Sequence, residues 1–85
     1  MREKITVLIA DDNQEFSMTL ATYLKNQEDM VVVGRAKDGN EAVLKVKEVQ
    51  FDLIIMDIMM PELDGFSACR EIRKMSDTPI IMLSA

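Results

Sequence analysis

The stretch Ile54–Gly65, IIMDIMMPELDG, decides how the chain folds. Its apolar first half is typical of a strand buried on both faces, and the run stops at a single carboxylate, Asp57. Pro61 then ends the segment. Moving a carboxylate out of water costs several kcal/mol unless a partner compensates its charge. We therefore expect Asp57 to close the strand, with its side chain at the edge of a sheet where compensation is available.

Apolar segments of the same kind alternate with helical patterns along the chain. Strands are predicted at Ile5–Ala10, Met30–Ala36, Phe51–Asp57 and, after Thr78-Pro79, in IIMLSA. Apolar residues at helical spacing predict three helices between them: one after the N-cap Asn13 with Phe16, Leu20, Tyr23 and Leu24, one near Asn40–Val49 with Ala42, Val43, Val46 and Val49, and one with Phe66, Cys69 and Ile72. This alternation predicts an α/β fold with a parallel sheet and helices on both faces.

The carboxyl ends of these strands bring acidic residues to one edge of the predicted sheet. Asp11 and Asp12 follow the first strand, Asp57 closes the third, and Ser84 lies at the end of the fourth. Ligands of open parallel sheets bind at this edge. Three carboxylates there repel one another unless a cation lies among them, and oxygen ligands without His or Cys suit Mg²⁺ or Mn²⁺ better than zinc. Taken singly, each aspartate also fits the simpler role of a helix cap or turn residue.

Composition narrows the class of protein. With 85 residues, 48% hydrophobic and 29% charged, the chain has room for one globular domain, residues 1–85, and no apolar run approaches the ~20 residues of a membrane span. A net charge of −5 argues against direct binding of nucleic acid. The absence of histidine removes the usual general base and zinc ligand. The single cysteine, Cys69, is expected to be a buried packing residue in a protein of the reducing cytoplasm.

Three motifs together resemble a known family. IADDN (residues 9–13), DIMMPELDG (57–65) and PIIMLSA (79–85) occur in the order and spacing of the receiver domain of bacterial two-component response regulators, and the match extends over the whole chain. The resemblance implies a flavodoxin-like, doubly wound parallel sheet. It also implies a signalling module that is not an enzyme beyond catalysing its own aspartyl phosphorylation and dephosphorylation.

The same resemblance assigns roles to individual residues. Asp57 is the expected phosphoacceptor and Ser84 the switch hydroxyl that turns toward the phosphoryl group. Asp12 and Asp57 are expected to bind Mg²⁺ directly, Asp11 through water, and Met59 through its backbone carbonyl. The expected partner is a sensor histidine kinase or a phosphotransfer protein, in a phosphorelay that controls an output such as transcription. DNA would be contacted only by an effector domain outside these residues.

The family pattern also extends past the last residue of this chain. A fourth helix, a fifth strand ending in a lysine and a fifth helix are expected to follow, so the chain reads as a receiver truncated after its fourth strand. An uncovered apolar fourth strand would favour self-association. Two alternatives stay open at this point: a receiver-like interaction module without phosphotransfer, and a haloacid-dehalogenase-like phosphatase, which wants an acid where Met59 stands.

Overall fold

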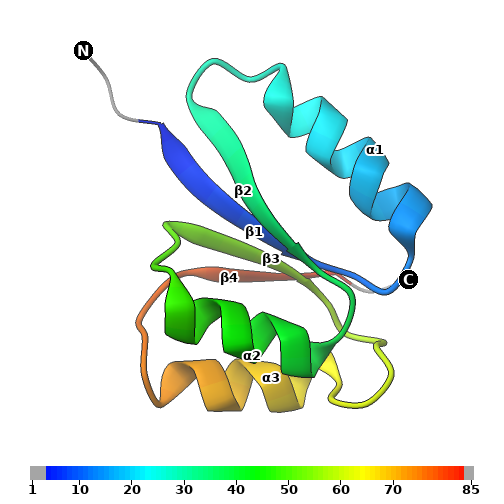
Figure 1. Ribbon diagram of the computed structural model, residues 1–85, viewed down its shortest axis with the longest axis vertical. Helices are drawn as coiled ribbons and strands as arrows, with labels where there is room; N and C mark the ends of the chain where they lie inside the picture. The colour runs from blue at the N-terminus through cyan, green and yellow to red at the C-terminus, as the bar shows by residue number, and fades with distance from the viewer. Residues whose placement is uncertain (1–3, 84–85) are drawn as a thin grey trace.

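The computed structural model describes residues 4–83, and these residues form the predicted α/β fold. The elements follow one another as β1 (Ile5–Ala10), α1 (Gln14–Lys25), β2 (Met30–Ala36), α2 (Gly39–Glu48), β3 (Leu53–Asp57), α3 (Gly65–Arg73) and β4 (Ile80–Leu83). The four strands are parallel in the order β2-β1-β3-β4. Figure 1 shows α1 on one side of this sheet and α2 and α3 together on the other, so the expectation of helices on both faces is confirmed.

The two central strands carry the core. Residues 7–10 of β1 are at most 1% exposed. Their side chains alternate between the two faces, as in any strand. Leu8 and Ala10 pack in a cluster with residues of α2 and α3, whereas Val7 and Ile9 pack in a second cluster with Leu24 of α1. Burial of each such aliphatic side chain contributes about 1.5–3 kcal/mol, so the sheet is held from both faces.

Helix α1 turns only part of the predicted stripe toward the sheet, because Leu20 and Leu24 face it and Phe16 and Tyr23 do not. It begins after Asn13, whose side chain accepts the Phe16 N–H at 3.0 Å, as expected of an N-cap. Phe16 and Tyr23 are nevertheless 43% and 64% exposed. The inner face instead carries Ser17 and Leu24, both buried, with Leu20 and Ala21 packed beside them. Small side chains at the contact let the helix lie close to the sheet, and the aromatic residues are left outside.

Helices α2 and α3 show the same preference for small residues at the contact. Ala42 of α2 and Ala68 of α3 are completely buried, whereas Phe66 is 56% exposed. Cys69 is only half-buried, so the prediction of a buried packing cysteine is wrong. Of the predicted stripe residues in α3, Ile72 alone reaches the core, because it shares the inner side of the helix with Ala68.

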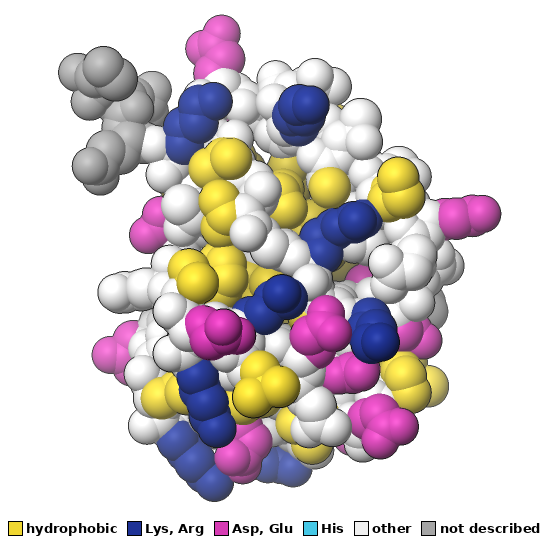
Figure 2. Space-filling model, viewed as in Figure 1, with side chains coloured by type: hydrophobic (Ala, Val, Ile, Leu, Met, Phe, Trp, Pro, Cys, Tyr) yellow, Lys and Arg dark blue, Asp and Glu magenta, His cyan; other side chains and the backbone are white. Residues whose placement is uncertain are grey.

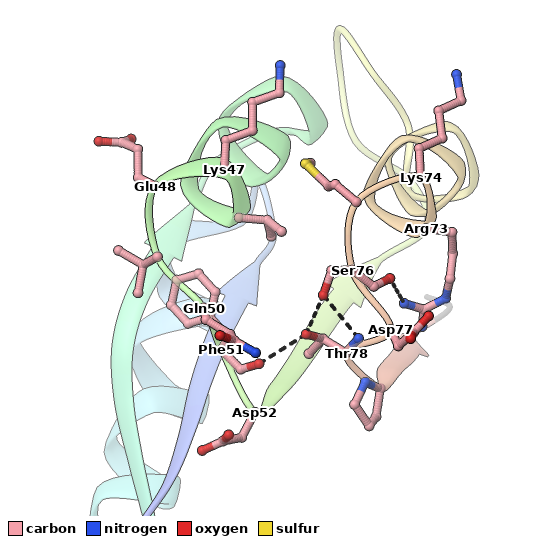
Figure 3. Close-up of a pocket in the computed structure, with 14 residues that line it drawn as sticks. Lys47, Glu48, Gln50, Phe51, Asp52, Arg73, Lys74, Ser76, Asp77 and Thr78 are labelled. Atoms are coloured by element: carbon pink, nitrogen blue, oxygen red, sulfur yellow. Dashed lines mark hydrogen bonds between the residues drawn. The ribbon is translucent and has the colours of Figure 1, made fainter.

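The amino ends of the strands are tied together by hydrogen bonds. Strand β3 begins at Leu53 rather than Phe51, and Asp52 before it accepts the backbone N–H and the hydroxyl of Thr6 at 2.9 and 3.1 Å. At the same end, Thr78 Oγ1 donates to the carbonyl of Phe51 at 3.1 Å. Figure 3 shows this bond at the floor of a hollow between the C-terminal ends of α2 and α3, from which Lys47 and Lys74 extend away. Thr6, Asp52 and Thr78 are thus hydrogen-bonded within the chain.

Candidate metal centre

The register of the central strands brings two of the predicted acids together. Strands β1 and β3 pair in parallel with Ala10 opposite Met56. The next residue along each strand is an aspartate: Asp11 directly follows β1, and Asp57 is the last residue of β3. Asp11 is anchored further by its N–H, which donates to the carbonyl of Ala36 at 2.9 Å. Both carboxylates thus leave the sheet at its carboxyl edge, as the sequence predicted.

The three acidic side chains converge on one point. One carboxylate oxygen from each of Asp11, Asp12 and Asp57 lies within 4.8 Å of the others. Asp11 is buried at 5% exposure, Asp57 is half-buried and Asp12 is exposed, so the group opens to solvent on one side. Backbone N–H groups orient two of them: Asn13 donates to Asp11 at 2.8 Å and Met59 donates to Asp57 at 3.1 Å.

The electrostatics of the group are unfavourable without a cation. Burial is the largest cause that raises the pKa of Asp11, and the charges of Asp57 and Asp12 raise it further. The hydrogen bond from Asn13 opposes this shift but does not cancel it. Asp11 is therefore a carboxylate held in a position where its ionised form is disfavoured, and a positive charge placed between the three groups would relieve it.

The donor set fits a small divalent cation. Ligand oxygens bound to Mg²⁺ at about 2.1 Å lie roughly 3–4 Å from one another, so the three oxygens need only small movements to surround an ion. All three are hard carboxylate oxygens, and the open side leaves room for water. The residues that could hold the ion are therefore Asp11, Asp12 and Asp57.

Two other predicted site residues relate differently to this centre. Met59 lies two residues after Asp57 with its side chain 70% exposed, and its backbone reaches the centre through the N–H bonded to Asp57. Ser84 lies outside the described residues. Its described neighbour Leu83 pairs with Asp57 in the ladder between β3 and β4.

The loop between β3 and α3 frames the centre. Asp64 caps α3 by accepting the Ser67 N–H at 2.8 Å, and this bond is the main cause that lowers the pKa of Asp64. Asp64 is therefore the N-cap residue of α3. Glu62 has a positive φ of 66°, an uncommon backbone conformation for a residue with a side chain. Such conformations occur where a loop is held in one shape, as here beside the acidic centre.

The sequence reasoning overlooked two basic residues near the centre. Arg35 and Lys37, from the end of β2 and the residue after it, line a hollow together with Asp12, Pro61 and Glu62. Their position in the sequence indicates this location, because they lie at the end of β2 and β2 ends at the same edge of the sheet as β1 and β3. These side chains bring positive charge to the border of an otherwise acidic region.

Comparisons with known proteins agree with this geometry. The model of the family described as "Response regulator receiver domain" matches residues 7–85. A protein-glutamate methylesterase/protein-glutamine glutaminase of Caldanaerobacter subterraneus subsp. tengcongensis is 41% identical over 85 residues, which are 100% of this chain and 23% of that protein. The transcriptional regulatory protein ResD of Bacillus subtilis is 40% identical over 79 residues, 93% of this chain and 32% of that protein. The chain thus spans less than a third of either relative.

Solved structures give the same result. The response regulator domain of Thermotoga maritima CheB superposes with a TM-score of 0.93 at 46% identity, over 96% of this chain and 61% of that one. A CheX-CheY complex with BeF3 and Mg²⁺ from Borrelia burgdorferi contains a chain with a TM-score of 0.85 at 32% identity, over 98% of this chain and 63% of that one. The haloacid-dehalogenase alternative is thereby excluded. Residues 4–83 form four parallel strands and three helices with the acidic centre at the carboxyl edge of the sheet, and the chain belongs to the response regulator receiver domain family.

Proposed function

We propose that this chain accepts a phosphoryl group on Asp57 and acts as the receiver module of a two-component phosphorelay. The observation that carries the proposal is the convergence of Asp11, Asp12 and Asp57 within 4.8 Å at the carboxyl edge of the sheet. Phosphoryl transfer depends mainly on positioning and on neutralising charge, and both are available where a carboxylate lies beside a cation site. Membership of the receiver family supports the same reading.

Each residue of the site has a separate role in the phosphoryl transfer. An oxygen of Asp57 attacks the phosphorus of a donor, a P–O bond to Asp57 forms, and the bond between phosphorus and the donor's leaving group breaks. The backbone N–H of Met59 donates a hydrogen bond to Asp57 Oδ1 and so orients the acceptor carboxylate. Asp12 and Asp57, with the Met59 carbonyl, would hold Mg²⁺ directly and Asp11 would hold it through water, and the bound ion would supply positive charge beside the acceptor. Ser84 is assigned the role of the hydroxyl that turns toward the new phosphoryl group.

The partners follow from the reaction. The donor is a phosphohistidine of a sensor kinase or a phosphotransfer protein in the cytoplasm. Among the described residues no helix is long and apolar enough to cross a membrane. The similar proteins carry different outputs, since one is named as a methylesterase and another as a transcriptional regulator. We assign transcription regulation as the output here, through an effector that lies outside these residues.

Acetyl phosphate and Mg²⁺ test the proposal directly. Incubation of the chain with both should give a mass increase of about 80 Da that is lost on treatment with base, because an acyl phosphate is base-labile. The Asp57→Asn variant should show no adduct, and Asp52→Asn, which changes an aspartate at the other end of β3, should keep it. Absence of any adduct in the unchanged chain, or an adduct that persists in Asp57→Asn, would overturn the proposal in favour of an interaction module without phosphotransfer.

A further inference from the structure

A groove runs between α1 and the outer strand β2, and none of the three aspartates of the acidic centre lines it. Its floor and walls include Ala21 and Lys25 of α1, Met30, Val31 and Val32 of β2, and Lys4 just before β1. Figure 2 shows hydrophobic side chains exposed between these two elements, with Lys and Arg side chains around them. The groove therefore combines an apolar floor with a basic border.

The charge of the groove is opposite to that of the chain. Lys4, Lys25 and Arg35 all line it, and among residues 4–83 no acidic residue does. Within residues 4–83 the one ion pair joins Lys74 to Glu71 on α3, so these three cations have no carboxylate partner there. The chain as a whole has a net charge of −5. A local positive surface on an acidic protein selects an acidic partner, because complementary potentials steer and orient association.

The edge of β2 favours an extended partner. Within the described sheet, β2 is an outer strand that pairs with β1 alone. Its register with β1 is regular over Met30–Val32 and breaks at the next residue, where Val33 is an extra residue and 49% exposed. The free backbone groups before this bulge can pair with an added strand, while the apolar floor receives alternate side chains of that strand.

We propose that this groove binds an extended acidic peptide segment of a partner protein, with apolar residues between its acids. The apolar residues would contact Met30 and Val32, and the acids would meet Lys4 and Lys25. Nucleic acid is a poor occupant, because three cations on a chain of net charge −5 give little of the charge that phosphate contacts require. The proposal does not depend on phosphorylation, since neither Lys4 nor Lys25 belongs to the acidic centre.

Fluorescence anisotropy with a labelled short peptide of alternating Glu and Val tests the proposal. The chain should bind this peptide, and added salt should weaken the binding because the contacting charges are exposed. A peptide of alternating Lys and Val should not bind, and one of alternating Glu and Ser should bind more weakly because the apolar floor then has no partner. In the NMR spectrum of the labelled chain, the amides of Lys25, Val31 and Val32 should shift, and that of Thr78 should not.

Charge reversal separates the groove from general electrostatics. The double variant with Lys4→Glu and Lys25→Glu should weaken binding of the Glu and Val peptide roughly tenfold, because reversal replaces attraction by repulsion at both contacts. The matched double variant with Lys47→Glu and Lys74→Glu changes the net charge equally on the opposite helices and should bind as the unchanged chain does. Circular dichroism confirms that both variants fold. Equal weakening in both variants, binding of DNA or anionic vesicles in place of the peptide, or shifts confined to other residues would overturn the proposal.

Discussion

The two ends of the same parallel sheet treat their aspartates in opposite ways. At the amino end, Asp52 accepts two hydrogen bonds from Thr6, at 2.9 and 3.1 Å. At the carboxyl end, Asp11 is buried with one N–H donor beside it and with two further carboxylates nearby. An aspartate surrounded by hydrogen-bond donors therefore stabilises the fold, whereas an aspartate surrounded by other acids is placed to bind a cation.

The contrast extends to the neighbouring polar groups. At the amino end Ser76 and Thr78 share a hydrogen bond of 2.6 Å, and Thr78 also satisfies the buried carbonyl of Phe51. At the carboxyl end the charge of the three aspartates is not compensated by any ion pair within residues 4–83. The polar groups named at the amino end are hydrogen-bonded within the chain, whereas the acids at the carboxyl end are placed to bind a cation. The predictions below test this division.

The largest effect is expected from Gly65→Ala, which would crowd the carboxyl end. A Cβ at this position would collide with the carbonyl oxygen of Asp57 and lie 2.8 Å from the Cα of Ile58. Both are backbone atoms of the segment that carries the acceptor, so the strain cannot be relieved by a side-chain movement. We expect the free energy of unfolding to fall by about 3 kcal/mol in urea titrations.

A second glycine provides the control for this change. A Cβ on Gly34 would lie 3.3 Å from the Cδ1 atom of Leu8, a side-chain atom that can move. Gly34→Ala should therefore change the stability by less than about 1 kcal/mol. Equal losses in the two variants would contradict the steric account of Gly65.

The next effect concerns the amino end. Thr78→Val keeps the shape of the side chain and removes the hydroxyl that donates to the carbonyl of Phe51. Thr78 is only 8% exposed, so the carbonyl would lose its partner in a buried position. We expect a loss of about 1–2 kcal/mol in thermal or urea unfolding. Thr19→Val, the same chemical change at an exposed position of α1, should stay within about 0.5 kcal/mol of the unchanged chain.

The smallest effect, and one of opposite sign, is expected from Asp11→Asn in the presence of EDTA. Because the folded-state pKa of Asp11 is raised, the folded chain binds its proton more tightly than the unfolded chain does. Ionisation of Asp11 therefore lowers the free energy of unfolding. This loss is absent below the ordinary pKa of 3.8, grows as the pH rises through the raised pKa, and is complete at neutral pH. The variant should therefore be more stable than the unchanged chain at pH 7, and this advantage should disappear toward low pH. A variant less stable than the unchanged chain at pH 7 without metal would show that the three charges do not oppose folding.

The sequence predicted the sheet and the acidic centre because both depend on patterns along the chain. Continuous apolar runs locate the strands, and in a parallel sheet the residues that follow neighbouring strands must meet at one edge. The acidity of Asp11, Asp12 and Asp57 then predicts a cation-binding centre at that edge. Their local geometry confirms the convergence.

The helix faces were harder to predict, because hydrophobicity alone does not choose between overlapping stripes. Ser17 and Ala21 are smaller than Phe16 and Tyr23, and these small residues lie against the sheet whereas the aromatic ones lie outside. The close approach of helix and sheet decides this outcome, and it depends on the volume of side chains rather than on their polarity. The positive φ of Glu62 and the approach of Arg35 and Lys37 to the centre likewise arise from the folded loops and leave no periodic signal.

The most direct test of the central claim is the effect of Mg²⁺ on the thermal stability of matched aspartate variants. A tenfold excess of Mg²⁺ over its dissociation constant should stabilise the unchanged chain and Asp52→Asn alike, by about 1.4 kcal/mol. Asp12→Asn and Asp57→Asn should lose this stabilisation, because each removes a ligand of the carboxyl-end centre. If Mg²⁺ stabilised all four proteins equally, or stabilised none of them, the division of the sheet into a structural end and a cation-binding end would be wrong.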